Sequence, residues 1–78
     1  MKATVVVRLK PEVLDPQGDA VRRALGTLGF EGVRGVRVGK IIEIEVEDGA
    51  KPEELQARLR KMADELFANP VIEDYEVR

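Results

Sequence analysis

The first ten residues alternate between apolar and polar positions. The apolar residues of this stretch share one parity: Ala3, Val5, Val7 and Leu9. Because successive side chains of a strand point to opposite faces, this pattern predicts a strand from Met1 to Lys10 with one buried face. Pro11 ends the strand, since proline has no N–H group to donate to a neighbouring strand.

A helical period follows the first strand. Asp15 can accept hydrogen bonds from the free N–H groups of a first helical turn, and Pro16 fits the first position. Apolar residues then recur at helical spacing: Val21, Ala24, Leu25 and Leu28. Gly29 can adopt the left-handed conformation that ends many helices. We therefore expect an amphipathic helix from Asp15 to Leu28 that packs its apolar face on a sheet.

Residues 33–47 return to a period of two and contain two apolar sets. Val36 and Val38 form the first set, and the second consists of Ile42, Ile44 and Val46. A two-residue turn at Gly39-Lys40 would place Glu43 beside the face of Val36. A three-residue loop, residues 39–41, would keep both apolar sets on one face. Because strand register follows the buried face, we predict a hairpin with the longer loop.

The last thirty residues predict a second helix and a last strand. Pro52 suits the first turn of a helix, and Glu53 and Glu54 place negative charge at its positive end. An apolar stripe follows: Leu55, Leu59, Met62, Ala63 and Leu66. Asn69-Pro70 ends this helix, because a residue before proline avoids the helical conformation. The last strand is expected from Val71 to Val77, with Val71, Tyr75 and Val77 on one face.

The order of these elements is β-α-β-β-α-β. It predicts an α+β, ferredoxin-like two-layer sandwich, in which two helices cover one face of an antiparallel four-stranded sheet. The 78 residues leave room for one domain, residues 1–78. A core this small usually gains support from a disulfide, a metal or a partner chain. The fold itself hosts many unrelated functions and names none of them.

Composition narrows the chemistry that the chain can perform. It contains no Cys, His or Ser, so it can form no disulfide, no Ser-His-Asp triad and no Cys-His pair. Carboxylates, lysines and Tyr75 remain for acid–base work. We expect no catalytic residue, no metal site and no cofactor in this chain. A small independent enzyme that uses carboxylates and Tyr75 is the least favoured alternative.

Charge and hydropathy limit the partners. Thirteen Lys and Arg against fifteen Asp and Glu give a net charge of −2, which offers no surplus for binding nucleic acid. No apolar run approaches the roughly 20 residues that span a membrane, and no signal-peptide pattern opens the sequence. We expect a cytoplasmic protein without a membrane or nucleic-acid partner.

Three short segments are not explained by periodicity: Leu14 to Gly18, Val36 to Lys40, and Asn69 to Glu73. A glycine near a helix start costs up to about 1 kcal/mol relative to alanine, so Gly18 suggests a close approach of its backbone to another surface. Each segment also has a structural interpretation, as a helix cap, a hairpin turn and a helix stop respectively.

Together these segments resemble the PurS family, the small subunit of phosphoribosylformylglycinamidine (FGAM) synthase. The family pattern also includes Val5 to Val7 and Leu28-Gly29, and the resemblance covers Lys2 to about Tyr75. It implies a non-catalytic subunit of an ATP- and glutamine-dependent C–N ligase complex in purine biosynthesis. Such a subunit docks a glutaminase (PurQ) and a large synthetase (PurL), which uses the ATP and Mg, and assists ammonia transfer. The family forms a homodimer or a dimer of dimers.

The resemblance and the loop positions suggest surface residues with binding roles. The candidates for subunit docking are Asp15, Gln17, Gly18, Arg37, Lys40, Asn69 and Glu73. Val6 and Ile41 would lie on the open face of the sheet, and we expect them to contact a second copy of the chain. Glu43, Glu45 and Glu47 are interpreted as a solvated face. An alternative function is an ACT-type module that senses a small ligand.

Overall fold

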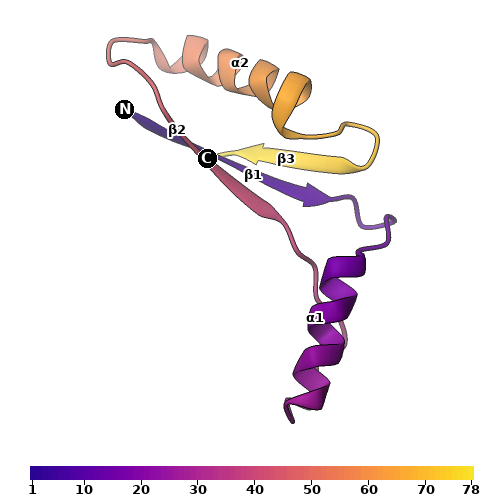
Figure 1. The fold of residues 1–78 in the computed structure, drawn as a ribbon. Helices are drawn as coiled ribbons and strands as arrows, with labels where there is room; N and C mark the ends of the chain where they lie inside the picture. Colours follow the sequence, from indigo (N-terminus) through magenta and orange to yellow (C-terminus); the bar gives the residue numbers. More distant parts are fainter.

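Strand β1 (Lys2–Leu9) is the centre of a three-stranded antiparallel sheet in the computed structural model, which describes residues 1–78 (Figure 1). It pairs with β2 (Lys40–Glu45) on one side and β3 (Glu73–Val77) on the other, in the order β2-β1-β3. In this register Val5 lies opposite Ile42 of β2 and Val77 of β3. The predicted first strand and its buried parity are confirmed.

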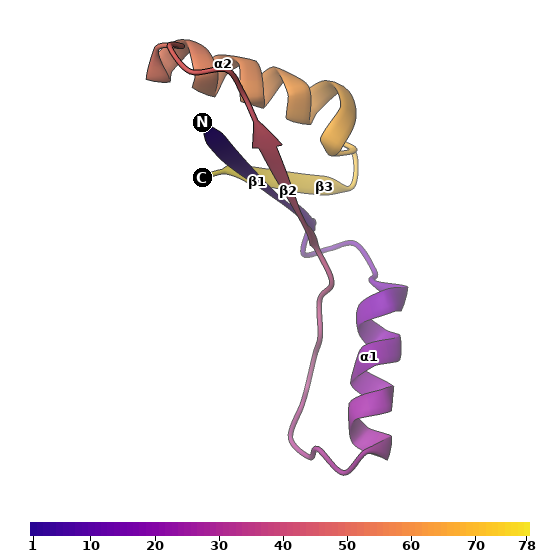
Figure 2. The same ribbon diagram turned by 60° about the vertical axis from the view of Figure 1, so that its left-hand side comes forward.

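The core lies between this sheet and the C-terminal helix. Helix α2 (Pro52–Met62) and the π-helical turn η1 (Ala63–Phe67) cover one face of the sheet (Figure 2). Val5, Val7, Ala63 and Ala68 form the buried cluster. The residues packed around it are Ile42, Ile44, Phe67, Tyr75 and Val77. The alternating pattern of β1 thus places Val5 and Val7 against the helical segment that covers this face.

The π-helical turn changes which residues of the second helix face the core. The N–H group of Ala68 donates to the carbonyl oxygen of Ala63 at 2.9 Å, five residues back. Because this turn holds one more residue than an α-helical turn, the side chains after it are rotated around the axis. Leu66, expected in the buried stripe, is 80% exposed, and Phe67 packs on the core in its place.

The last strand begins two residues later than predicted. Asn69 starts a tight turn, in which its carbonyl oxygen accepts from the N–H groups of Ile72 (3.1 Å) and Glu73 (2.7 Å). Val71 lies in this turn and is exposed, so its expected place on the core face is wrong. Tyr75 and Val77 lie on that face as predicted.

Helix α1 (Pro16–Thr27) extends away from the sheet. Residues 33–39 return beside it as an extended segment, and both views show the two running side by side (Figures 1 and 2). We call residues 14–39 the arm. The arm gives the chain a radius of gyration of 16.2 Å and dimensions of 50 × 25 × 15 Å. A compact chain of this length has a radius of gyration of about 11–12 Å.

The four-stranded ferredoxin-like sandwich is therefore wrong in two respects. Residues 33–38 form no strand, so the sheet has three strands, and only α2 covers its face. The predicted hairpin loop at residues 39–41 is absent, because Lys40 and Ile41 already pair with Val7 and Val6 of β1. Gly39 makes no left-handed turn. Its missing side chain serves a close approach instead, since a Cβ atom there would lie 2.7 Å from the carbonyl oxygen of Val7.

The carboxylate of Asp15 holds the base of the arm together. Oδ1 accepts from the N–H group of Gly18 at 2.8 Å, which confirms the predicted helix cap. Oδ2 accepts from the N–H group of Val38 at 2.7 Å, on the returning segment. A Cβ atom at Gly18 would lie 2.0 Å from the carbonyl oxygen of Val36, which accounts for the glycine. One side chain thus joins the two halves of the arm.

Replacing Asp15 should separate its two roles. The hydrogen bonds from Gly18 and Val38 lower the pKa of Asp15 below its ordinary value of 3.8. Asp15→Asn keeps one acceptor for the helix cap but loses the second, whereas Asp15→Ala loses both. We expect thermal unfolding midpoints to fall in the order wild type, Asp15→Asn, Asp15→Ala.

The stability difference between wild type and Asp15→Asn should also depend on pH. A carboxylate with a lowered folded-state pKa stabilises the fold above its unfolded value, and this contribution is lost as the pH falls through 3.8 towards the folded pKa. The stability difference between wild type and Asp15→Asn, measured by circular dichroism, should therefore shrink at acidic pH. A difference that stays constant down to pH 2 would contradict the role of the ionised carboxylate.

The π-helical turn predicts different effects on stability for substitutions at the adjacent residues Leu66 and Phe67. Phe67→Ala should lower the free energy of unfolding by about 1–3 kcal/mol, because it opens space against the core. Leu66→Ala should change it by less than about 0.5 kcal/mol, as expected for an exposed position. Denaturant titration of both variants provides the measurement. Equal losses would mean that the helix keeps its α-helical phase through these residues.

Candidate functional site

The three segments that periodicity left unexplained meet at the end of β1. We call residues 14–18, 36–40 and 69–73 together the junction. Asp15 joins the first segment to the second, as described above. The backbone of Lys10 joins the second to the third: its N–H group donates to Ile72 at 2.8 Å, and its carbonyl oxygen accepts from Nη2 of Arg37 at 2.9 Å. Residues from three distant parts of the sequence therefore form one surface.

A cavity of about 290 Å³ lies within the junction. It is lined by Val7, Leu9, Gln17, Val38, Gly39, Lys40 and Glu73. Gln17, Lys40 and Glu73 each come from a different segment of the junction, so the structure brings three of the predicted docking residues together.

Three of the other predicted docking residues have roles within the fold. Asp15 and Gly18 are buried in the base of the arm and offer no free group to a partner. The N–H group of Asn69 donates to Oε1 of Glu73 at 2.7 Å, while Oδ1 of Asn69 accepts from Val71 at 3.1 Å. These contacts shape the turn before β3. Arg37, in contrast, is exposed.

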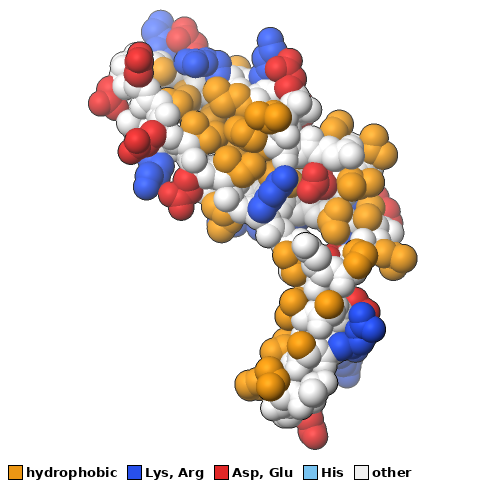
Figure 3. All heavy atoms as spheres, in the orientation of Figure 1, with side chains coloured by type: hydrophobic (Ala, Val, Ile, Leu, Met, Phe, Trp, Pro, Cys, Tyr) orange, Lys and Arg blue, Asp and Glu red, His pale blue; other side chains and the backbone are white.

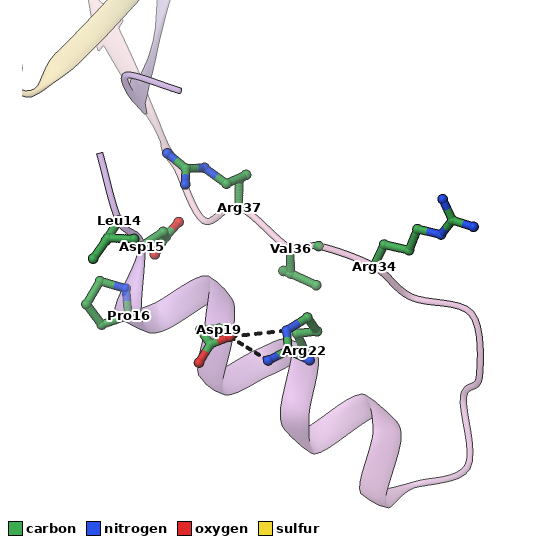
Figure 4. Close-up of a pocket in the computed structure, with 9 residues that line it drawn as sticks. Leu14, Asp15, Pro16, Asp19, Arg22, Arg34, Val36 and Arg37 are labelled. Carbon is green, nitrogen blue, oxygen red and sulfur yellow. Dashed lines mark hydrogen bonds and ion pairs between the residues drawn. The ribbon is translucent and has the colours of Figure 1, made fainter. Parts of the chain in front are cut away.

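A second cavity, of about 390 Å³, lies on the arm between α1 and the returning segment (Figure 4). Asp19 bonds Arg22 there at 2.7 Å and pairs with Arg23 at 3.4 Å. The bond to Arg22 is the main cause of a lowered pKa of the Asp19 carboxyl. Arg34 points away from the helix (Figure 4). Because both acidic residues of this cavity are engaged, it presents no free carboxylate for acid–base chemistry.

A third cavity, of about 620 Å³, lies where the open face of the sheet meets the arm. Its lining consists of Val6, Arg8, Leu9, Pro11, Arg37, Val38, Gly39, Lys40 and Ile41. Sequence reasoning missed Arg8 and Pro11 as neighbours of Arg37 and Lys40, because it placed the latter two on a hairpin. The parity that Arg8 shares with Val6 was the available signal.

Val6 and Ile41, predicted to contact a second copy, are direct neighbours across β1 and β2. Val6 is 6% exposed and supports the surface from below, whereas Ile41 is 64% exposed. Only Ile41 offers a sizeable apolar side chain to a partner.

Tyr75 is the remaining chemically distinctive side chain. Partial burial raises the pKa of its phenol, and a hydrogen bond to Asp64 raises it further. The phenol therefore stays protonated at neutral pH and is a poor base. No group of three or more His, Cys, Asp or Glu side chains is arranged to hold a metal ion. None of the helices is both long and apolar enough to cross a membrane.

Comparison with known proteins agrees with this description. Residues 2–78 match the family described as PurS, phosphoribosylformylglycinamidine (FGAM) synthase. The PurS subunit of FGAM synthase from Methanocaldococcus jannaschii is 44% identical over 77 residues, covering 99% of this chain and 92% of that protein. The subunit from Bacillus subtilis is 43% identical over 74 residues, covering 95% and 86%.

Solved structures show the same fold. A crystal structure of Bacillus subtilis PurS has a TM-score of 0.86 and 42% identity, covering 99% of this chain and 94% of that chain. A chain in the structure of PurLQS from Thermotoga maritima also has a TM-score of 0.86, with 36% identity and coverage of 99% and 93%. The resemblance noted in the sequence is confirmed, and the chain belongs to the PurS family of FGAM synthase subunits.

Proposed function

We propose that this chain is the small, non-catalytic subunit of an FGAM synthase in purine biosynthesis, where it assembles with a synthetase subunit and a glutaminase subunit. The observation that carries the proposal is the likeness of 99% of the chain to a chain of the Thermotoga maritima PurLQS structure. The chain's own geometry supports it, because exposed surfaces and no assembled reacting groups suit a docking subunit. The cytoplasm is the location that fits this role.

We infer a role in ammonia transfer because ammonia is protonated when it reaches water. Ammonia released into water at neutral pH becomes mostly ammonium, which has no lone pair and is no nucleophile. A closed interface that excludes water keeps neutral ammonia available between the two active sites. This chain would add area and geometry to that interface, while ATP and Mg are used by the synthetase subunit.

The junction is the surface that we propose for docking. Gln17, Arg37 and Lys40 are exposed on it and can reach a partner. Asp15, Gly18, Asn69 and Glu73 would act indirectly, because their hydrogen bonds and close contacts fix the shape of the surface. Assembly with the partner subunits would then depend on the intact arm base as well as on the exposed side chains.

We also propose that the arm is covered by a second copy of the chain. The accessible surface of 6054 Å² exceeds the roughly 4,700 Å² expected for a compact monomer of this mass. The excess is larger than the roughly 800 Å² that each partner buries in a standard interface. Hydrophobic side chains gather along one side of the arm (Figure 3). The exposed large hydrophobic side chains of the arm are Leu14, Val21, Leu28, Phe30, Val33 and Val38.

A homodimer, alone or paired into a dimer of dimers, would remove this apolar surface from water. Ile41 lies directly after the arm on the open face of the sheet, so it can extend the same contact. Self-association of this kind also supplies the support that a small core needs.

The function is tested by reconstitution with the synthetase and glutaminase of the same organism. Glutamine-dependent formation of FGAM should require this chain. Turnover with added ammonium salt should require it less, because the synthetase then receives its nucleophile from solution. If glutamine-dependent turnover is the same with and without the chain, the proposed function is wrong.

Self-association is tested by charge placed in the proposed contact. Leu28→Lys, at a side chain that is 72% exposed, and Ile41→Lys should each weaken the dimer by at least about tenfold, because a lysine would be brought against apolar surface. Gln56→Lys, on an exposed position of α2, is the matched control and should leave it unchanged. Sedimentation over a range of protein concentrations measures the difference. If Leu28→Lys and Ile41→Lys both sediment like wild type, this contact is excluded.

A further inference from the structure

The 620 Å³ cavity on the open face of the sheet combines a basic rim with an apolar floor. Arg8, Arg37 and Lys40 are its only charged lining residues, and no acidic residue lines it. We propose that these three side chains, which we call the cation site, dock an acidic segment of a partner subunit. The segment would place carboxylates on the cations and an apolar side chain on the floor. This inference rests on the proposed function and names the chemistry of the partner surface.

The charge of the cation site stands out against the rest of the chain. Residues 8–40 carry seven Lys and Arg against four Asp and Glu, whereas residues 41–78 carry five against eleven. The basic residues are therefore concentrated in the arm and its base, although the net charge of the chain is −2. A local basic surface of this kind steers an acidic partner and fixes its orientation.

The cations of the site retain most of their binding capacity. The side chain of Lys40 makes no ion pair and no hydrogen bond with its own chain. Arg37 uses one N–H group to bind the carbonyl oxygen of Lys10, which fixes the guanidinium and leaves its other donors free. Arg8 makes an exposed contact with Glu76 at 3.5 Å, and such a surface pair contributes little. A fixed guanidinium with free donors suits bidentate binding of a carboxylate.

The floor of the cavity favours a protein segment over a nucleotide. It is made by aliphatic residues: Val6, Leu9, Val38 and Ile41. Because Val38 and Ile41 also belong to the proposed contact between copies, the partner segment would bind at the edge of the dimer, beside that contact. No aromatic side chain lines the cavity to stack a base, and Gly39 is its single lining glycine. An apolar contact surrounded by arginine–carboxylate pairs is instead the usual composition of a protein interface.

Charge reversal at Lys40 tests the proposal, because this side chain has no bond within its own chain to lose. Lys40→Glu is compared with Lys61→Glu, an exposed position on α2 that undergoes the same change of charge. Affinity for the synthetase and glutaminase is measured by titration at several salt concentrations. We expect Lys40→Glu to weaken binding by about tenfold or more at low salt and to flatten its salt dependence. Lys61→Glu should stay within about twofold of wild type.

Three results would overturn the proposal. The first is equal affinity of the two variants for the partner subunits. The second is saturable binding of inorganic phosphate to the isolated chain that Lys40→Glu abolishes, since the cavity would then hold a small anion. The third is loss of self-association by Lys40→Glu in sedimentation, since the residue would then act through the dimer. Failure of the proposed function is a separate result, in which wild type itself does not support glutamine-dependent turnover.

Discussion

The shape of the arm depends on the two hydrogen bonds that the Asp15 carboxylate accepts. One caps helix α1 and the other holds the returning segment at Val38, so the arm is a closed loop with a fixed base. Gly18 lets the helix approach the returning backbone, and Gly39 lets that backbone approach β1. The carboxylate is the one side chain that hydrogen-bonds both to the start of α1 and to the segment that leads into β2. The base of the arm is therefore held by one buried side chain and two glycines, and Arg37 links it to the end of β1 through the carbonyl oxygen of Lys10.

The local elements could be predicted from the sequence because their causes are local. The alternation of β1 and the cap at Asp15 required only neighbouring residues, and both are confirmed. The predicted hairpin was wrong, because the same alternation also fits a single extended segment whose residues from Lys40 onward pair with β1. The prediction that α1 packs on the sheet was wrong, because an apolar helical face indicates that something covers it without indicating what. The π-helical turn has no sequence signal in spacing alone, so Phe67 packs on the core where Leu66 was expected.

The candidate site was predicted in part for the same reasons. The three unexplained segments do come together, although the sequence placed them on separate turns. Arg37 and Lys40 were selected as isolated charges, and only the pairing of Lys40 with Val7 shows that Arg8 belongs beside them. Residues that lie on one face of the fold but about thirty positions apart in the sequence cannot be recognised from hydrophobic periodicity. Their grouping becomes visible once strand register is known.

The residues of the family motifs are mostly those that build the base of the arm. The residues that identify the family therefore differ from those that can bind a partner. Internal contacts occupy Asp15, Gly18 and Gly39, so a partner cannot bind these residues directly. They keep the arm in place and thereby hold Arg37 and Lys40 at the edge of the sheet. A motif of this kind specifies the shape of a surface, and the exposed side chains on it supply the affinity. Because the two sets of residues differ, a substitution in the motif should disturb all contacts of the chain at once, whereas a substitution at an exposed cation should disturb a single one.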